Sequence, residues 1–334
     1  MKRASGVLMP VFSLPSKYGI GCFSKEAYKF VDQLKKAGQS YWQILPLGPT
    51  GYGDSPYQSF STYAGNPYFI DLKTLVKEGL LTKKECKEVR CKEQKKIDYE
   101  KIYQNRFKIL KKAYRRFQKN DKYEKFLEEN AFWLEDYCMY MAIKDAHEGK
   151  SWSEWEELLK KREKTALEKV KEELEDEIGF YQFQQYEFDR QWKKLHTYAK
   201  EQGIQIIGDI PIYVAFDSAD AWAAPELFQF DEENNPIRVA GCPPDAFAKT
   251  GQLWGNPLYN WEYHQKTGYA WWIQRIRYCF QHYDVVRIDH FRGFDEYYAI
   301  PYGESTAENG TWMTGPGMKL FQAIEKELGR PEII

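Results

Sequence analysis

Short apolar runs recur along this 334-residue chain, separated by longer amphipathic or polar stretches. Four of the runs are rich in β-branched and aromatic residues and have the length of buried strands. They cover residues 6–12, 41–47, 204–211 and 284–289. The hydrophobic pattern therefore predicts at least four strands, and two of them lie far from the other two along the chain.

The stretch between the first two predicted strands predicts a helix. Ser24 is a suitable N-cap and Gly38 supplies the stop. Apolar side chains recur between them at helical spacing, at Ala27, Phe30, Val31 and Leu34. Strand, helix and strand in this order form a βαβ unit, so the two strands should run parallel. Because strands and helices continue to alternate, we expect a parallel α/β barrel rather than a sandwich or a bundle.

The last predicted strand ends in charged residues. Side chains alternate between the two faces of a strand, so Val286 and Ile288 share one face while Arg287 and Asp289 share the other. In barrel enzymes the catalytic groups sit at the carboxyl ends of the strands. Asp289 is therefore the first candidate for chemistry, and Asp209 ends the preceding strand in the same way.

An alternative interpretation of this pattern is a structural ion pair between Arg287 and Asp289. Such pairs do occur and perturb neighbouring charges. However, burying two charges merely to brace a strand is a poor route to stability. An arginine beside a carboxylate lowers the carboxylate pKa, typically by about 1–3 units, which keeps a nucleophile ionised. We therefore favour the functional interpretation.

Residues 72–202 differ in character from the rest of the chain. They are rich in Lys and Glu, and they carry two patterns of the capping-box type, at Thr82 with Glu85 and at Ser153 with Glu156. Their aromatic residues mostly have the spacing of buried helical positions. We interpret this stretch as a helical insertion between the second and third strands.

Two long segments without periodicity follow predicted strands. Residues 48–68 are rich in tyrosine, which argues for an ordered, functional loop rather than disorder. Residues 241–259 contain so many glycines and prolines that we expect no regular structure there. In this second loop Trp254 and Asn256 offer an aromatic face beside hydrogen-bonding groups.

Composition narrows the classes of partner. The formal net charge is −1, which gives no electrostatic footprint for nucleic acid or an anionic membrane. Aromatic residues make up 17% of the chain, and a neutral site of aromatic and polar groups would suit sugar rings, although loop aromatics more often simply pack. The six cysteines show no metal-ligand spacing, and no apolar run is long enough to span a bilayer. We expect free thiols and a cytoplasmic location.

Taken together, four segments resemble a known family. They are the segment around Asp289, residues 208–214, the loop 51–68 and the loop 241–259. They resemble the amylomaltases, or 4-α-glucanotransferases, of glycoside hydrolase family 77, and the resemblance runs from residue 6 to residue 334. It implies an α-amylase-type (β/α)8 barrel that moves α-1,4-glucan segments by a retaining double displacement. It also implies α-1,4-glucans and maltooligosaccharides as substrates, as in starch, glycogen and maltodextrin, with glucose as an acceptor and no cofactor or metal.

The resemblance assigns roles to individual residues. Asp289 is the implied nucleophile and Arg287 is its partner. Asp209 would hydrogen-bond hydroxyls of the sugar at the cleavage point, Tyr57 would stack there, and Trp254 would lie in a mobile loop on the acceptor side. Tyr52 resembles a residue of a secondary glucan site. The full set of substrate-binding residues implied in this way is Tyr57, Asp209, Trp254, Asn256, Ser55, Tyr52 and His290.

The resemblance also suggests how the chain is divided. Residues 1–71 would hold the first barrel strands and the active-site loop, residues 72–202 the helical insertion, and residues 203–334 strands three and four up to the start of strand five. A retaining enzyme needs a second carboxyl as proton donor. In the family this is a glutamate just past strand five, and Glu332 lies too early for the role, so we expect the donor to lie outside this sequence. A plain α-glucan hydrolase and a non-catalytic glucan-binding protein remain the alternatives.

Overall fold

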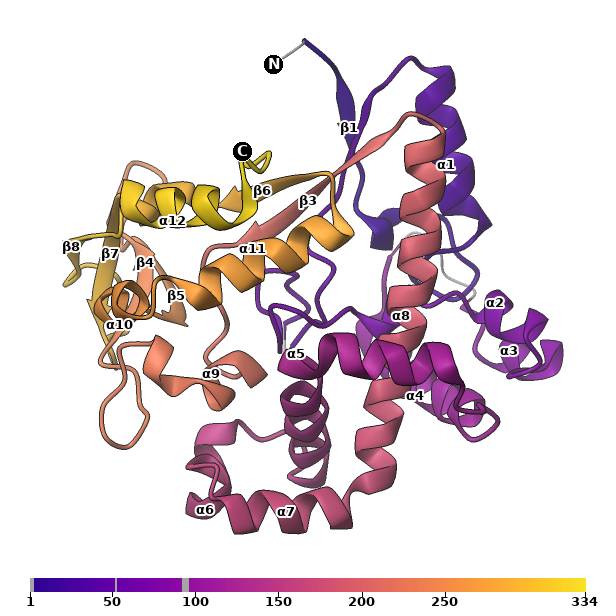
Figure 1. Cartoon of the computed structure of the whole chain (residues 1–334), viewed down its shortest axis with the longest axis horizontal. Helices are drawn as coiled ribbons and strands as arrows, with labels where there is room; N and C mark the ends of the chain where they lie inside the picture. The colour runs from indigo at the N-terminus through magenta and orange to yellow at the C-terminus, as the bar shows by residue number, and fades with distance from the viewer. Residues whose placement is uncertain (1–2, 52, 92–95) are drawn as a thin grey trace.

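A computed structural model describes residues 3–51, 53–91 and 96–334. Its centre is a parallel sheet with the strand order β1-β2-β3-β6 (Figure 1). The strands are β1 (Gly6–Leu8), β2 (Tyr41–Gln43), β3 (Gln205–Pro211) and β6 (Val285–Asp289). All neighbours in this sheet pair in parallel, as the sequence predicts. The first two strands are shorter than expected, since the chain turns into a 3₁₀-helix at Val11–Ser13.

The carboxyl end of the chain lies beside β6. Ile333 forms a parallel bridge with Val286, and the backbone N–H of Val286 donates to the carbonyl of Glu332. Residues 332–334 therefore begin a fifth parallel strand at the position expected from the sequence. The α-amylase-type barrel predicted from the sequence is consistent with this succession of neighbouring parallel strands.

Helices connect successive strands of the parallel sheet. They are α1 (Lys25–Lys36), α8 (Glu175–Glu201), α11 (Ala270–His282) and α12 (Met318–Leu328). The helix predicted between the first two strands is confirmed: the Ser24 side chain caps α1, and Gly38 follows it with a φ of +68°. Buried side chains of α1, β2 and α8, among them Val31, Trp42 and Trp192, pack into one core cluster.

The stretch expected to be a helical insertion is helical. Besides α8 it contains α2 (Leu72–Lys77), α3 (Lys83–Glu88), α4 (Tyr99–Tyr114), α5 (Asp121–Ala146), α6 (Glu157–Lys160) and α7 (Lys164–Glu173). The capping box at α3 is confirmed, because Thr82 Oγ1 accepts from the Glu85 backbone at 3.2 Å and Glu85 accepts from the Thr82 backbone at 2.8 Å.

The prediction of a second capping box, at Ser153 and Glu156, is wrong. Residues Trp152–Glu154 form a 3₁₀-helix, and α6 starts only at Glu157 without a side-chain cap. Trp152 is fully buried and its indole donates to the Phe216 carbonyl at 2.7 Å. Ser153 meanwhile donates to the Ser151 hydroxyl. Tertiary anchoring of Trp152 thus overrides the local capping pattern.

The expectation of an irregular segment over residues 241–259 is also wrong. The strands β4 (Arg238–Cys242) and β5 (Gln252–Pro257) form an antiparallel sheet with β7 (Glu296–Pro301) and β8 (Thr311–Thr314) in the order β5-β4-β7-β8. Glycine serves this pairing, because a Cβ at Gly241 would come within 2.2 Å of the Gln252 carbonyl oxygen. In Figure 1 this sheet lies at the left, while α2–α4 lie at the right.

Two short helices, α9 (Ala219–Ala223) and α10 (Trp261–Lys266), complete the connection between β3 and α11. A second core cluster joins α5, α9 and α11 through buried rings such as Tyr140, Trp222 and Trp272. All six cysteines are free thiols, as expected. None of the helices in the described ranges is long and apolar enough to cross a membrane.

Candidate active site

The carboxyl ends of β3 and β6 bring three charged side chains together. In the strand register Asp209 lies opposite Arg287, and Pro211 lies opposite Asp289. Arg287 Nη1 donates to Asp209 Oδ1 at 2.6 Å, and Arg287 Nη2 donates to Asp289 Oδ1 at 2.7 Å. One guanidinium therefore bridges two carboxylates from neighbouring strands. Val286 and Ile288, on the opposite face of β6, are buried in the core, which confirms the predicted alternation.

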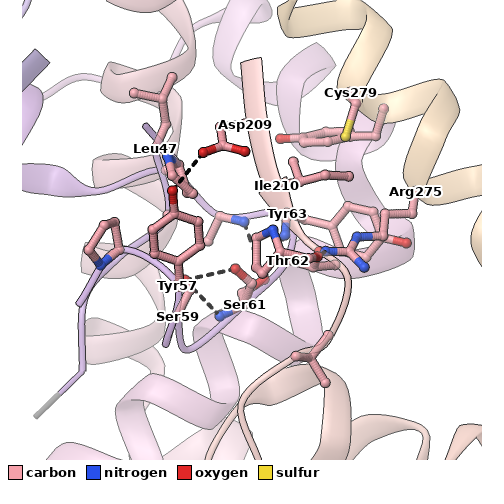
Figure 2. A pocket seen from close by; sticks show the side chains of 18 of the residues that line it. Leu47, Tyr57, Ser59, Ser61, Thr62, Tyr63, Asp209, Ile210, Arg275 and Cys279 are labelled. Atoms are coloured by element: carbon pink, nitrogen blue, oxygen red, sulfur yellow. Dashed lines mark hydrogen bonds between the residues drawn. The ribbon is translucent and has the colours of Figure 1, made fainter. Parts of the chain in front are cut away.

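The two aspartates differ in exposure. The side chain of Asp209 is 1% exposed, and its second oxygen accepts a hydrogen bond from the Tyr57 hydroxyl at 2.7 Å (Figure 2). The side chain of Asp289 is 41% exposed, and in the described part of the chain only Arg287 bonds to it. Asp289 is thus the carboxylate that remains open to a ligand.

The protonation equilibria of these groups follow from burial and from their partners. Burial raises the pKa of Asp209, while the hydrogen bonds from Tyr57 and Arg287 oppose that shift. Burial and the bond to Asp209 raise the pKa of Tyr57, so the phenol stays a hydrogen-bond donor. Burial lowers the pKa of Arg287, but the two carboxylates outweigh this effect and raise it. The bridging cation is therefore permanent.

An aromatic wall stands beside Asp289. His290 has a left-handed backbone with a φ of +58°, which turns the chain sharply at the end of β6. Its ring meets that of Trp254 edge-on with centroids 4.8 Å apart, and Tyr213 lies 6.3 Å away. Burial lowers the pKa of His290, and its Nε2 is a buried atom without a hydrogen-bond partner among the described residues. Trp254 on β5 is thereby placed next to the residue that follows Asp289.

Two of the predicted ligand-binding residues, Asn256 and Ser55, make hydrogen bonds within the loops, and their role toward a ligand stays a prediction. Asn256 is 5% exposed, and its amide donates to the Val214 carbonyl at 2.7 Å and accepts from Gln58 at 3.1 Å. Ser55 accepts a hydrogen bond from the backbone of Tyr57 at 3.3 Å, so it shapes the turn that presents Tyr57. Tyr52 lies outside the described residues. The hydrogen bond from Gln58 to Asn256 could not be predicted from the sequence, although Gln58 lies next to Tyr57.

A pocket lies beside Asp209. It is bounded by the loop residues Tyr57, Ser59, Ser61 and Tyr63 and by Arg275 of α11 (Figure 2). The loop is held by its own hydroxyl groups, because Ser59 donates to the Ser61 carbonyl and Ser61 Oγ accepts from the Tyr63 backbone. Tyr57 is therefore carried by a braced turn rather than by a loose loop.

Glu332 does not reach this site. Ile333 is paired with Val286, so Glu332 is level with Val285 and lies four residues short of Asp289, a distance of about 13 Å at the rise of a strand. Two carboxyls that act together in a retaining mechanism stand about 5–5.5 Å apart. This register is compatible with the sequence-based exclusion of Glu332 as proton donor, which stays a prediction.

Metal-ligand groups are a separate question. In residues 3–51, 53–91 and 96–334 no group of three or more His, Cys, Asp or Glu side chains is arranged to hold a metal ion.

Comparison with known proteins identifies the family. The family model described as 4-alpha-glucanotransferase matches residues 9–334. A 4-alpha-glucanotransferase of Clostridium butyricum is 51% identical over 98% of this chain and 68% of its own length. The enzyme of the same name from Streptococcus pneumoniae is 51% identical over 100% of this chain and 67% of its own length. The chain thus spans about two thirds of these relatives.

Solved structures agree with the sequence comparison. The amylomaltase from Streptococcus agalactiae, solved in complex with acarbose, has a TM-score of 0.96 and 43% identity, and the match covers 99% of this chain and 68% of that one. The amylomaltase from Corynebacterium glutamicum has a TM-score of 0.78 at 18% identity over 98% of this chain and 46% of that one, and shows the fold alone. The chain belongs to the 4-alpha-glucanotransferase family, the amylomaltases of glycoside hydrolase family 77, and transfer of α-glucan segments is supported over the alternatives of hydrolysis and non-catalytic binding.

Proposed function

We propose that Asp289 is the nucleophile of a retaining α-1,4-glucan transfer. The observation that carries this assignment is the difference between the two bridged carboxylates, since Asp289 is open while Asp209 has both oxygens occupied. A nucleophile needs a free oxygen directed at the sugar. Arg287 fixes the Asp289 carboxylate from one side and leaves the other oxygen free.

Asp209 and Tyr57 are proposed to bind the sugar at the cleavage point together. Because Asp209 is almost fully buried, a sugar hydroxyl reaches its carboxylate only when the Tyr57 hydroxyl gives up or shares its hydrogen bond. In this proposal the Tyr57 ring stacks on the sugar. Before substrate binds, the Tyr57 hydroxyl donates to Asp209 the hydrogen bond that a sugar hydroxyl donates later. Such a group lowers the cost of keeping a buried carboxylate in the empty site.

Trp254 and His290 are proposed to receive the acceptor, which is glucose or the end of another glucan. Their edge-to-face contact gives a rigid aromatic wall next to Asp289. A wall of this kind stacks a sugar ring and excludes water, which favours transfer over hydrolysis. The related amylomaltase was solved in complex with acarbose, which supports a saccharide as a ligand of this chain.

A second groove supports the proposal of a secondary glucan site around Tyr52. The described residues that line this groove include Gly51 and Gly53. Its lining is rich in tyrosine, with Tyr68 from the loop and Tyr99, Tyr103, Tyr137 and Tyr181 from the helical region. Phenol rings are suited to long neutral saccharides.

The wider setting of the enzyme is proposed on the same basis. We propose a division into residues 1–71, 72–202 and 203–334, in which α8 closes the helical part and also packs against α1. The six free thiols support a reducing, cytoplasmic compartment. The near-zero net charge supports neutral glucans, and not nucleic acid or membrane, as partners.

Replacing the proposed nucleophile tests the assignment. In the full-length enzyme, Asp289→Asn should reduce maltotriose disproportionation by on the order of 10⁴-fold or more, since the covalent intermediate can no longer form. Glucose and longer maltosaccharides are measured together, and glycogen binding should persist. Asp295→Asn, at an exposed carboxylate six residues further on, is the matched control and should keep full activity. Substantial transfer by Asp289→Asn would remove Asp289 from this role.

A further inference from the structure

We propose that a groove between α5, α9 and α11 is a non-catalytic binding site for an α-glucan chain. Its lining includes Phe132 and Asp136 of α5, Asp220 of α9, and Trp271 and Gln274 of α11. In Figure 1 α9 lies below α11. The inference rests on α-glucan as the substrate class and does not depend on the role of any residue at the Asp289 site.

Aromatic rings in this groove are both accessible and fixed. Phe132 is 47% exposed, and its ring contacts Tyr63 edge-on with centroids 5.3 Å apart. Trp271 is partly exposed and is held by Tyr259 at 5.7 Å and by the Arg275 guanidinium at 5.5 Å. Rings that are already immobilised lose little conformational entropy when a sugar packs on them. Phe132 is an exposed apolar ring on an otherwise charged helix surface, which suits a ligand-contacting position better than a packing one.

Hydrogen-bonding groups accompany the rings. Asp220 is 8% exposed, and one of its oxygens accepts from the Thr62 backbone at 2.8 Å, while the carboxylate lines the groove. Asp136 is oriented by Arg162 at 2.5 Å and is 37% exposed. The Gln274 carbonyl accepts from Arg277 at 3.0 Å, which leaves its NH₂ group as a donor. Sugar hydroxyls, which both donate and accept, match this mixture of acceptors and a donor.

Charge restricts the class of ligand. No lysine, arginine or histidine is among the described residues that line the groove, and two of those residues are carboxylates. Phosphates and other anions would therefore be repelled. One carboxylate is already paired with Arg162, so the groove also lacks the charge density that a hard cation needs. A neutral polyhydroxyl chain is the ligand that fits.

The groove lies close to the pocket beside Asp209, which suggests how it would assist the reaction. Ser61 and Tyr63 line both this groove and the pocket beside Asp209, so the two cavities are separated only by the loop that carries Tyr57. A polymer held on the outer side of that loop keeps its other segments at a high effective concentration near the active site. Short oligosaccharides would gain nothing from the groove. The proposal therefore links the groove to polymeric substrates.

The test compares a polymer with a trisaccharide. Phe132→Ala and Gln274→Ala are made in the full chain, with Phe132→Trp as the conservative variant. Tyr302→Ala, at a side chain that is 54% exposed near the antiparallel sheet, is the matched control. Glycogen is the probe in native affinity electrophoresis, and maltotriose disproportionation is measured in parallel.

We expect Phe132→Ala to weaken retardation by glycogen roughly three- to tenfold, the effect of one lost aromatic contact. Phe132→Trp should keep retardation, and all variants should keep the wild-type kcat/KM for maltotriose. Unchanged retardation in both alanine variants overturns the proposal. So does a parallel loss of maltotriose activity and thermal stability, which would mark Phe132 as a packing residue. If Asp289→Asn fails to abolish transfer, the proposed nucleophile is wrong, but the electrophoretic comparison still decides the groove.

Discussion

The neighbouring strands β3 and β6 each carry an aspartate near the carboxyl end, Asp209 and Asp289, yet the fold gives the two side chains different environments. Asp209 is sealed beneath Tyr57, and Asp289 faces the open side of the sheet. Both share one guanidinium. The difference shows that exposure and the number of hydrogen-bond partners, rather than residue type or strand position, distinguish the two aspartates. Our proposal of a binding role for Asp209 and a nucleophilic role for Asp289 rests on this difference.

Removing the Arg287 guanidinium should have the largest effect on activity and stability, because it contacts both Asp209 and Asp289. We expect Arg287→Met to lower kcat/KM for maltotriose by roughly 10³-fold, because both carboxylates lose the charge that orients them. It should also lower the free energy of unfolding by about 3 kcal/mol, since Asp209 would be left buried without a cation. Urea unfolding measures the second effect.

The control for this variant is Arg292→Met. Arg292 packs over the Trp312 ring at 4.3 Å and pairs with Glu296 at 3.3 Å on the surface. Its loss should change stability by less than about 1 kcal/mol and leave activity intact. Equal effects of the two substitutions would mean that the bridge at the strand ends is an ordinary surface ion pair.

Removing the Tyr57 hydroxyl should make the environment of Asp209 more like that of Asp289, because Asp209 then loses one of its two hydrogen-bond partners. Tyr57→Phe deletes the hydroxyl that donates to Asp209 and keeps the ring. We expect kcat/KM to fall roughly tenfold, the loss of one hydrogen bond to a charged group. Because that bond favours the ionised carboxylate, its loss raises the pKa of Asp209 further above its usual value.

The pH profile reports this shift with a defined sign. Activity that requires ionised Asp209 is lost as pH falls through the pKa of Asp209, so the acid limb of kcat/KM should move to higher pH in Tyr57→Phe. Tyr63→Phe serves as the control, since the Tyr63 ring lines the same pocket without touching Asp209. An acid limb that stays in place would show that Asp209 does not titrate in the active range.

Trp254 tests the surroundings of the exposed Asp289, where we propose that the acceptor binds. Trp254→Ala removes the ring that meets His290 at 4.8 Å. We expect the ratio of glucose transfer to hydrolysis to fall by roughly three- to tenfold, because water gains access and the acceptor loses a stacking surface. Trp312→Ala, at a tryptophan that is 42% exposed on β8, should leave the ratio unchanged.

The parallel part of the fold could be predicted because its signals are local. A β-branched run that ends in aspartate marks both β3 and β6, and a cap and a glycine bound α1. The antiparallel sheet was missed because glycine and proline are frequent over residues 241–259, and because β4, besides pairing with β5, is completed on its other side by β7, about 60 residues away. Likewise, Ser153 fits a capping pattern but is overruled by the burial of Trp152.

The candidate site follows the same division. Asp209, Arg287 and Asp289 lie on predicted strand ends, so their meeting could be expected from the topology of a parallel sheet. Which carboxylate is open could not, because it depends on Tyr57 arriving from a loop about 150 residues away. The supporting roles of Asn256 and Ser55 are equally non-local, since each is defined by the loop it braces.

A third carboxylate, that of Asp220, illustrates the effect of burial on the pKa when no arginine forms an ion pair with the aspartate. Asp220 lies in α9, nearly fully buried, and burial raises its pKa to about 6 in spite of the Thr62 backbone bond and the more distant charge of Arg275. The folded protein therefore binds a proton between about pH 4 and pH 6 that the unfolded chain releases. Stability from this group is present below pH 4 and is lost as pH rises to about 6.

Asp220→Asn should accordingly have no effect on maltotriose transfer and a measurable one on stability. Its amide oxygen can still accept from Thr62, while the buried charge is gone. Above pH 6 we expect the variant to be more stable than the parent by up to about 3 kcal/mol, the equivalent of two pKa units, and the difference should vanish near pH 4. Urea unfolding at both pH values, with Asp295→Asn as the exposed control, measures it. A variant that is less stable at every pH would show that the Asp220 carboxylate has a partner as effective as Arg287 is for Asp209, and that burial alone does not set the difference between the two strand ends.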